Sequence, residues 1–323
     1  MFNVTSMPFT LTNVATTINC YFSIFLLIFG VVGNLLNLLV LSQRSLRSNA
    51  CAWLFLISSV FNLISLLAGL PTRVLSSWTI VVTDEVEWLC RLRVFLVLAS
   101  RTAAAWLIMF ATFDRWLLSC RHIHYRRLSK LKNAQRAMIC ILFLSCFIYS
   151  SIFYCYQANL RNTPLKCYSQ TTMCRIISDQ IYLCFTVLIP TILMICFSLL
   201  TLSNVRRMHH RLQMSLLTEL SQTMIRKRRR FRLLDRHLLV MLLVQIGFFI
   251  LFTFPQGIEM IYLTVTRNDF KSTSQLTIEN AIFTFTLSLT YLASGMPFYV
   301  YTISGGRAFQ QAFFRFIARL IVN

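Results

Sequence analysis

Acidic residues are scarce in this sequence. Only 10 of its 323 residues are Asp or Glu, and all charged residues together make up 13% of the chain. Charged residues are roughly a quarter of a typical soluble domain, whereas 57% of this chain is hydrophobic. The composition excludes an ordinary soluble domain and predicts a membrane protein.

The sequence also lacks the patterns that an enzyme needs. It contains no nucleophile and base at a recognisable spacing, no glycine-rich phosphate loop and no cluster of metal ligands. The paired His209 and His210 fall in a predicted loop without a plausible set of further ligands. We therefore predict no enzymatic activity, no metal site and no cofactor. Because tandem repeats and low-complexity tracts are absent too, we expect a single domain over residues 1–323.

Seven apolar runs are each long enough to cross a bilayer as a helix, which takes about 20 residues. They fall within residues 20–303 and read Tyr21–Leu41, Cys51–Leu70, Leu89–Leu118, Ala137–Tyr156, Ile177–Leu202, His237–Val265 and Ala281–Ile303. The predicted fold class is therefore an all-α membrane protein, a seven-transmembrane helix bundle.

The distribution of basic residues predicts the topology, because cytoplasmic loops are enriched in Lys and Arg. With the N-terminus outside, the loops after the first, third and fifth runs and the tail hold 21 of the 31 Lys and Arg residues. We therefore expect a multi-pass plasma-membrane protein with residues 1–19 extracellular. No basic residue precedes the first run, so we expect it to be an uncleaved anchor. Asn3 lies in a glycosylation sequon on that side.

The net charge of +21 then reflects this topology. The basic residues 226–230 would contact anionic lipid of the inner leaflet, so we do not predict nucleic-acid binding. Residues 304–323 alternate Phe with Arg and predict a short amphipathic eighth helix on the inner face, with a short cytoplasmic tail.

Polar residues and prolines interrupt the apolar runs. Asn34 and Asn62 lie inside the first two runs, where amide side chains usually form hydrogen bonds between helices. Prolines inside spans kink a helix and free a backbone carbonyl. We therefore predict hinges at Pro190, Pro255 and Pro297.

An acid and a base, Asp114 and Arg115, stand side by side near the end of the third run. Arg115 follows Cys90 by 25 residues. A helix of that length rises about 37 Å, more than the roughly 30 Å hydrocarbon core, so the two residues would lie at opposite membrane faces. A guanidinium there is costly unless it is paired. The pair is either a functional element or a simple interfacial ion pair.

Arg101 is the only charged residue between Val94 and Phe113. It lies about 16 Å of helix below Cys90, where it would form the floor of an extracellular pocket. One hypothesis is that it receives an acidic or carbonyl group of a ligand. The alternative is that it is a structural partner of Glu259, Asp179 or a backbone carbonyl.

Seven runs with these residues at these depths resemble the rhodopsin-like (class A) family of G-protein-coupled receptors. Four features carry the resemblance: Gly33-Asn34 in the first run, Cys90 placed 25 residues before Arg115, the variant motif Asp114-Arg115-Trp116, and Phe254-Pro255 in the sixth run. The asparagines of the first run and the loop 46–49 are most similar to invertebrate peptide-type receptors.

The resemblance implies a switch at the cytoplasmic face. Arg115 would be held by Asp235, and breaking that bridge would let the sixth helix move outward and admit a heterotrimeric G protein. Tyr301 would be the seventh-helix switch residue if Pro297 takes the asparagine position of the family motif. Aligning proline with proline would put Val300 there instead.

The resemblance also implies a disulfide between Cys90 and the loop that follows the fourth helix. Cys167, which stands 23 residues before Pro190, is the preferred partner, and Cys174 is the alternative.

Departures from the family pattern restrict the ligand. Asn62 and Ala104 replace the polar residues of the family's sodium pocket, so we do not expect sodium binding. The run Ala281–Ile303 has no Lys, which excludes retinal, and Val97 replaces the aspartate of amine receptors. We therefore predict a neuropeptide ligand in a pocket lined by Val97, Arg101, Gln256, Glu259, Tyr262 and Tyr291.

Two alternative functions remain. A seven-span transporter or channel would need ionisable residues along its path and usually inverted repeats, and the sequence offers Arg101 and no repeat. The second alternative is a receptor that binds ligand with weak or no G-protein coupling. It is suggested by Thr253 and Ser198, which replace residues that relay the signal in the family.

Overall fold

The computed structural model describes residues 6–75, 85–160, 165–215, 222–266 and 269–304. Side chains are described in these ranges except at residues 6–16, 44, 45, 208–215, 222–239, 241 and 304. Asn3 and the predicted amphipathic segment after residue 304 lie outside the described residues.

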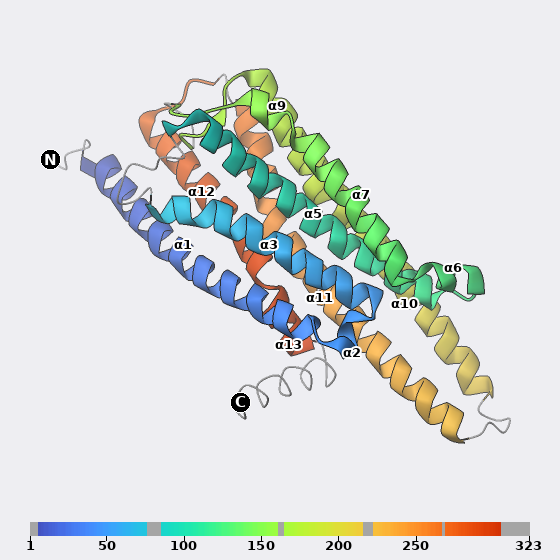
Figure 1. Ribbon diagram of the computed structural model, residues 1–323. Helices are drawn as coiled ribbons and strands as arrows, with labels where there is room; N and C mark the ends of the chain where they lie inside the picture. Colours follow the sequence, from blue (N-terminus) through green and yellow to red (C-terminus); the bar gives the residue numbers. More distant parts are fainter. Residues whose placement is uncertain (1–5, 76–84, 161–164, 216–221, 267–268, 305–323) are drawn as a thin grey trace.

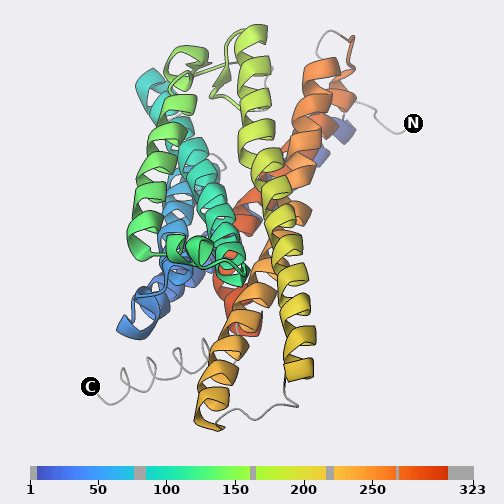
Figure 2. The ribbon, with the colours of Figure 1, turned by 90° about the vertical axis from the view of Figure 1, so that its right-hand side faces the viewer.

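Long helices lying side by side form one elongated bundle (Figure 1). They are α1 (Ser6–Leu41), α3 (Ala50–Leu75), α5 (Glu87–Ser119), α7 (Leu131–Tyr149), α10 (Ile189–Ser215), α11 (Gln222–Val265) and α12 (Thr273–Gly295). Shorter helices connect or extend them: α2 (Arg44–Arg47), α6 (Ile123–Leu128), α8 (Ile152–Cys155), α9 (Thr172–Ile181), the π-helix η1 (Tyr182–Leu188) and α13 (Pro297–Ser304). Figure 2 shows α10 and α11 extending beyond the other helices at one end.

The predicted all-α seven-helix bundle is confirmed. Within the described residues, six helical segments are long and apolar enough to cross a membrane, and α12 with α13 forms a seventh span that is bent by 50°. Helices suit this environment because a bilayer core offers no water to satisfy backbone groups, so each segment must bond internally. Large apolar side chains such as Phe143 on α7 and Ile192 on α10 lie exposed on the outside of the bundle, where lipid would cover them.

The three predicted hinge prolines have different surroundings. Pro297 begins α13 directly after the break in the seventh span, where its missing N–H and its ring end a helix. Pro190 follows the wide turns of η1, a helix type often found at irregular positions. Pro255 lies inside α11, which continues through it to Val265. The seventh span is therefore bent just before Pro297, where a hinge was predicted, whereas the sixth helix continues through Pro255.

Small and amide residues bring α1 and α12 together. The Asn34 side chain donates hydrogen bonds to the carbonyl of Ser294 at 3.0 Å and to that of Gly30 at 2.8 Å. Gly30 and Gly295 face each other, and a Cβ built on Gly295 would lie 3.0 Å from the Gly30 Cα. Such close backbone contact substitutes for the hydrophobic driving force that lipid does not provide.

Two disulfides close the end of the bundle that contains Cys90, called here the disulfide end. Cys90 is bonded to Cys167, and Cys174 is bonded to Cys155. Between these bonds lies a short antiparallel hairpin of β1 (Tyr156–Gln157) and β2 (Tyr168–Ser169). Burial raises the pKa of Tyr156 to about 12, so this phenol stays neutral. The sequence did not indicate the second bond because Cys155 falls inside the predicted fourth run.

The close approach of α1 and α12 predicts that a larger residue at Gly295 lowers the stability of the protein. Gly295→Ala should push the two backbones apart and lower the thermal unfolding midpoint of the purified protein by several degrees, since overpacking costs about 1–3 kcal/mol. Gly247→Ala is the matched control, because a Cβ there meets nothing within 4 Å. Equal midpoints for the two variants would contradict a tight α1–α12 contact.

Candidate functional site

The Asp114–Arg115 pair is buried at the end of α5 opposite the disulfide end, called here the Arg115 end. Their side chains are 9% and 4% exposed. Arg115 Nη2 donates to Asp114 Oδ2 at 2.9 Å and to Asn49 Oδ1 at 2.8 Å. The guanidinium is therefore shared between its own helix and the residue just before α3.

A second connection completes this buried network. The Ser129 hydroxyl donates to Asp114 Oδ1 at 2.5 Å. Ser129 follows α6, and Asn49 also accepts a hydrogen bond from the backbone N–H of Cys51 at 3.0 Å. A buried ion pair is stable only when further hydrogen bonds satisfy its remaining atoms. The two loops supply one such hydrogen bond to each member of the pair, so Asp114, Arg115, Asn49 and Ser129 form one unit, the Arg115 network.

Sequence reasoning missed Asn49 and Ser129. Both lie in connecting segments, whose contacts with α5 are set by tertiary packing. Asp235, the predicted partner of Arg115, lies in α11, but its side chain is outside the described residues. The Arg115–Asp235 bridge stays a prediction.

Tyr301 connects the seventh span to the sixth. Its hydroxyl donates to Gln245 Oε1 at 2.6 Å, and both side chains are buried. Its ring lies 4.8 Å from that of Phe55 on α3, measured between centroids. The neighbouring Val300, the alternative switch position, lines a cavity instead.

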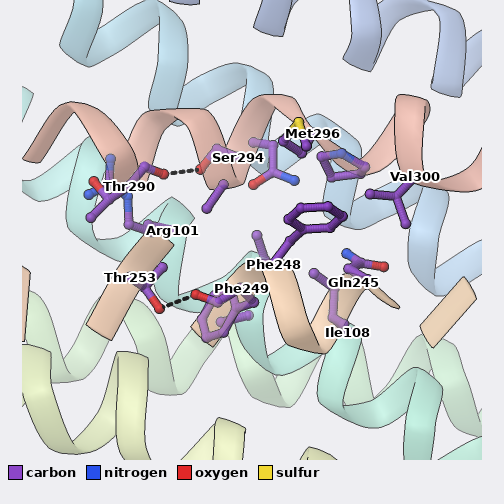
Figure 3. Close-up of a pocket in the computed structure, with 15 residues that line it drawn as sticks. Arg101, Ile108, Gln245, Phe248, Phe249, Thr253, Thr290, Ser294, Met296 and Val300 are labelled. Atoms are coloured by element: carbon purple, nitrogen blue, oxygen red, sulfur yellow. Dashed lines mark hydrogen bonds between the residues drawn. The ribbon is translucent and has the colours of Figure 1, made fainter. Parts of the chain in front are cut away.

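That cavity lies in the middle of the bundle and is enclosed by five helices. Its volume is about 30 Å³, which is room for a water molecule or two. Figure 3 shows Arg101 and Thr290 at one end, and Gln245 and Val300 toward the other. Asn62 also lines it. The lining contains a guanidinium and no carboxylate, so its donor set does not fit a sodium ion.

Arg101 is 4% exposed, and its Nε and Nη2 atoms have no hydrogen-bond partner. Its guanidinium lies over the Tyr291 ring, 4.5 Å from the centroid. Asp179, one proposed structural partner, instead accepts a hydrogen bond from Thr264 at 2.8 Å. Within the described residues, neither Asp179 nor Glu259 forms an ion pair with Arg101. The structural alternative for Arg101 is thus supported by contact with the Tyr291 ring and by the neighbouring Tyr182 hydroxyl.

The two cavities described for α11 and its neighbours hold different members of the six predicted pocket residues. Val97 and Tyr291 belong to the same apolar cluster, beside Arg101. Gln256 is fully buried and accepts a hydrogen bond from Thr286 at 2.8 Å. Glu259 and Tyr262 line a separate cleft between α11 and α12. The single pocket stays a prediction, with Arg101 at the central cavity and Glu259 and Tyr262 at the cleft between α11 and α12.

The Tyr301–Gln245 contact makes a prediction about stability. Tyr301→Phe leaves the Gln245 carbonyl buried without this donor, which should cost about 1–3 kcal/mol. Adding Gln245→Leu removes the unsatisfied amide, so the double variant should lose less than the sum of the two single losses. Thermal midpoints of the four proteins measure this coupling. Strictly additive losses would show that the two side chains do not interact.

Comparison with known proteins places this geometry in a family. The sequence matches the family described as 7 transmembrane receptor (rhodopsin family) over residues 33–297. No curated protein matches the chain. Because the family match covers most of the sequence and every span from the middle of α1 to the start of α13, the protein belongs to the rhodopsin-like family of seven-transmembrane receptors.

Proposed function

We propose that this receptor transmits the binding of an extracellular neuropeptide to a heterotrimeric G protein at the plasma membrane. The disulfide end and the N-terminus face outward, and the Arg115 end faces the cytoplasm. The observation that carries the proposal is the buried Arg115 network. Two separate loops bind this charged pair. A rearrangement of the pair would therefore move both loops and change the whole Arg115 end.

In the resting state, the Arg115 guanidinium donates hydrogen bonds to acceptors within the receptor. In this state it bonds to Asp114 and Asn49. Release of α11 would open a space beside Arg115 for a segment of the G protein. A ligand favours this open state only to the extent that it binds it more tightly than the closed one.

Asp235 is the proposed link between Arg115 and α11. It precedes Gln245 by ten residues, about 15 Å of helix, and lies farther toward the Arg115 end. Two contacts would then hold α11 closed: Tyr301–Gln245 near the middle and Arg115–Asp235 at the end. Outward movement of α11 would break both.

Transport is disfavoured because the family is one of receptors. Weak coupling is the remaining alternative, and one observation bears on it. The Thr253 hydroxyl donates to the carbonyl of Phe249 in its own helix at 2.6 Å. This relay position is therefore satisfied locally, and the link from ligand to α11 must use other residues.

Signalling variants test this function. Asp235→Ala should raise ligand-independent G-protein dissociation in cells about fivefold, because loss of about 1 kcal/mol from the closed state changes the equilibrium by that factor. Arg115→Ala should abolish the response to an activating pool from a peptide library. Arg121→Ala removes an exposed charge at the same end and is the control.

All variants are compared at equal surface expression. An unchanged baseline in Asp235→Ala would contradict the bridge to α11. Peptide binding without any G-protein response in the unmodified receptor would contradict coupling and leave a binding-only receptor.

A further inference from the structure

An open cleft lies between α11 and α12 at the disulfide end, away from the Arg115 network. Its volume is about 600 Å³. One part of its lining is apolar, from Ile258, Ile278 and Ile282, which are about half exposed. The other part is acidic, from Glu259 and Glu279.

Glu259 is a buried carboxylate with no cation at ion-pair distance among the described residues. The residue is only 9% exposed, and its Oε1 atom has no hydrogen-bond partner. None of the ion pairs in the described part of the chain includes it. A buried charge without a partner is costly, so a carboxylate in this position is suited to receive a cation from outside the chain.

The neighbouring acid shows how this cleft holds a cation. Lys271 Nζ forms an ion pair with Glu279 Oε2 at 2.6 Å and donates to the Thr266 hydroxyl at 2.8 Å. It also lies 5.5 Å from the centroid of the Tyr262 ring. Tyr262 in turn donates its hydroxyl to Glu279 Oε1 at 3.1 Å. The chain's own ammonium group is therefore bound by a carboxylate, a hydroxyl and an aromatic ring.

Among the described residues, the charges of the cleft do not balance. Lys271 compensates Glu279, and Glu259 is left over. Gln275 adds an amide that donates to Glu279 at 3.4 Å, so it contributes no compensating charge. One positive charge from outside the chain would complete the set, and the three isoleucines would contact the apolar part of the same molecule.

We propose that the α11–α12 cleft is a binding subsite for a primary ammonium group carried on an apolar stem, with Glu259 as its counter-ion. The inference rests on the proposed function in that the ligand reaches the receptor from the disulfide end. A peptide that binds this subsite must carry a lysine side chain or a free amino terminus. The same chemistry is present in the ethanolamine headgroup of an outer-leaflet lipid, and the test separates these two sources.

The test uses the full-length receptor in nanodiscs and needs no G protein. Ser274, which lines the cleft, is changed to Cys, and its reaction rates with a cationic and an anionic methanethiosulfonate reagent are compared. The chain with Ser274 intact gives the background. A negative Glu259 accelerates the cationic reagent and slows the anionic one. Adding Glu259→Gln should therefore lower the cationic-to-anionic rate ratio about tenfold.

Glu87→Gln is the matched control, since Glu87 is an exposed carboxylate at the same end that pairs with Arg91. It should leave the ratio unchanged. N-acetyl-lysine methylamide at millimolar concentration should slow the cationic reagent when Glu259 is present and not in Glu259→Gln. The leucine analogue, which lacks the ammonium group, should have no effect.

Lipid composition identifies the source. Protection by the lysine compound in phosphatidylglycerol discs, with no effect of phosphatidylethanolamine, supports a soluble ligand. A slower reaction in phosphatidylethanolamine discs alone supports the headgroup. A rate ratio that does not change in Glu259→Gln, or changes equally in Glu87→Gln, overturns the subsite. Because the readout is chemical modification, a receptor that fails to signal would refute the proposed function without affecting this result.

Discussion

The structure depends on one constraint: a charge inside an apolar bundle must have partners, because neither lipid nor the packed interior supplies water. Arg115 satisfies it most fully. Asp114 neutralises the guanidinium, and Asn49 and Ser129 each add a hydrogen bond to the pair. Those two residues belong to loops next to α3 and α6, so the charge of one helix determines how two connections lie against it. The described part of the Arg115 end is therefore organised around this buried cation.

Other charges in the bundle satisfy the same constraint only in part. Arg101 has an aromatic ring beside it and unpaired donor atoms, and Glu259 has a buried oxygen without a donor. Arg101 lies between the Arg115 network and the disulfide end, and Glu259 lies at the disulfide end. The Asp114–Arg115 ion pair thus holds the structure at one end, whereas Arg101 and Glu259, which form no ion pair among the described residues, lie toward the other end, where a ligand can contribute binding energy. This difference fits a receptor that is closed at the Arg115 end and receptive at the opposite end.

Much of the fold was predictable because it follows from local rules. The length of apolar runs indicates the spans, and helical rise places Cys90 and Arg115 at opposite ends of α5. The residues that complete the sites were not predictable in this way. Asn49, Ser129 and Lys271 lie in loops or at helix starts, and the Cys155–Cys174 bond joins two segments through tertiary packing. The direction of Glu259 away from Arg101 depends on how α11 is rotated, which residue spacing alone does not determine.

We propose that the Arg115 end opens by movement of α11 when a G protein binds. Spin labels at Gln135 on α7 and Val240 on α11, both exposed near that end, report this distance by electron paramagnetic resonance. The exposed Cys140, Cys146 and Cys196 are replaced by serine so that they are not labelled. The account predicts one short distance for the receptor alone and a longer one in complex with a nucleotide-free G protein. The same distance in both samples would contradict it.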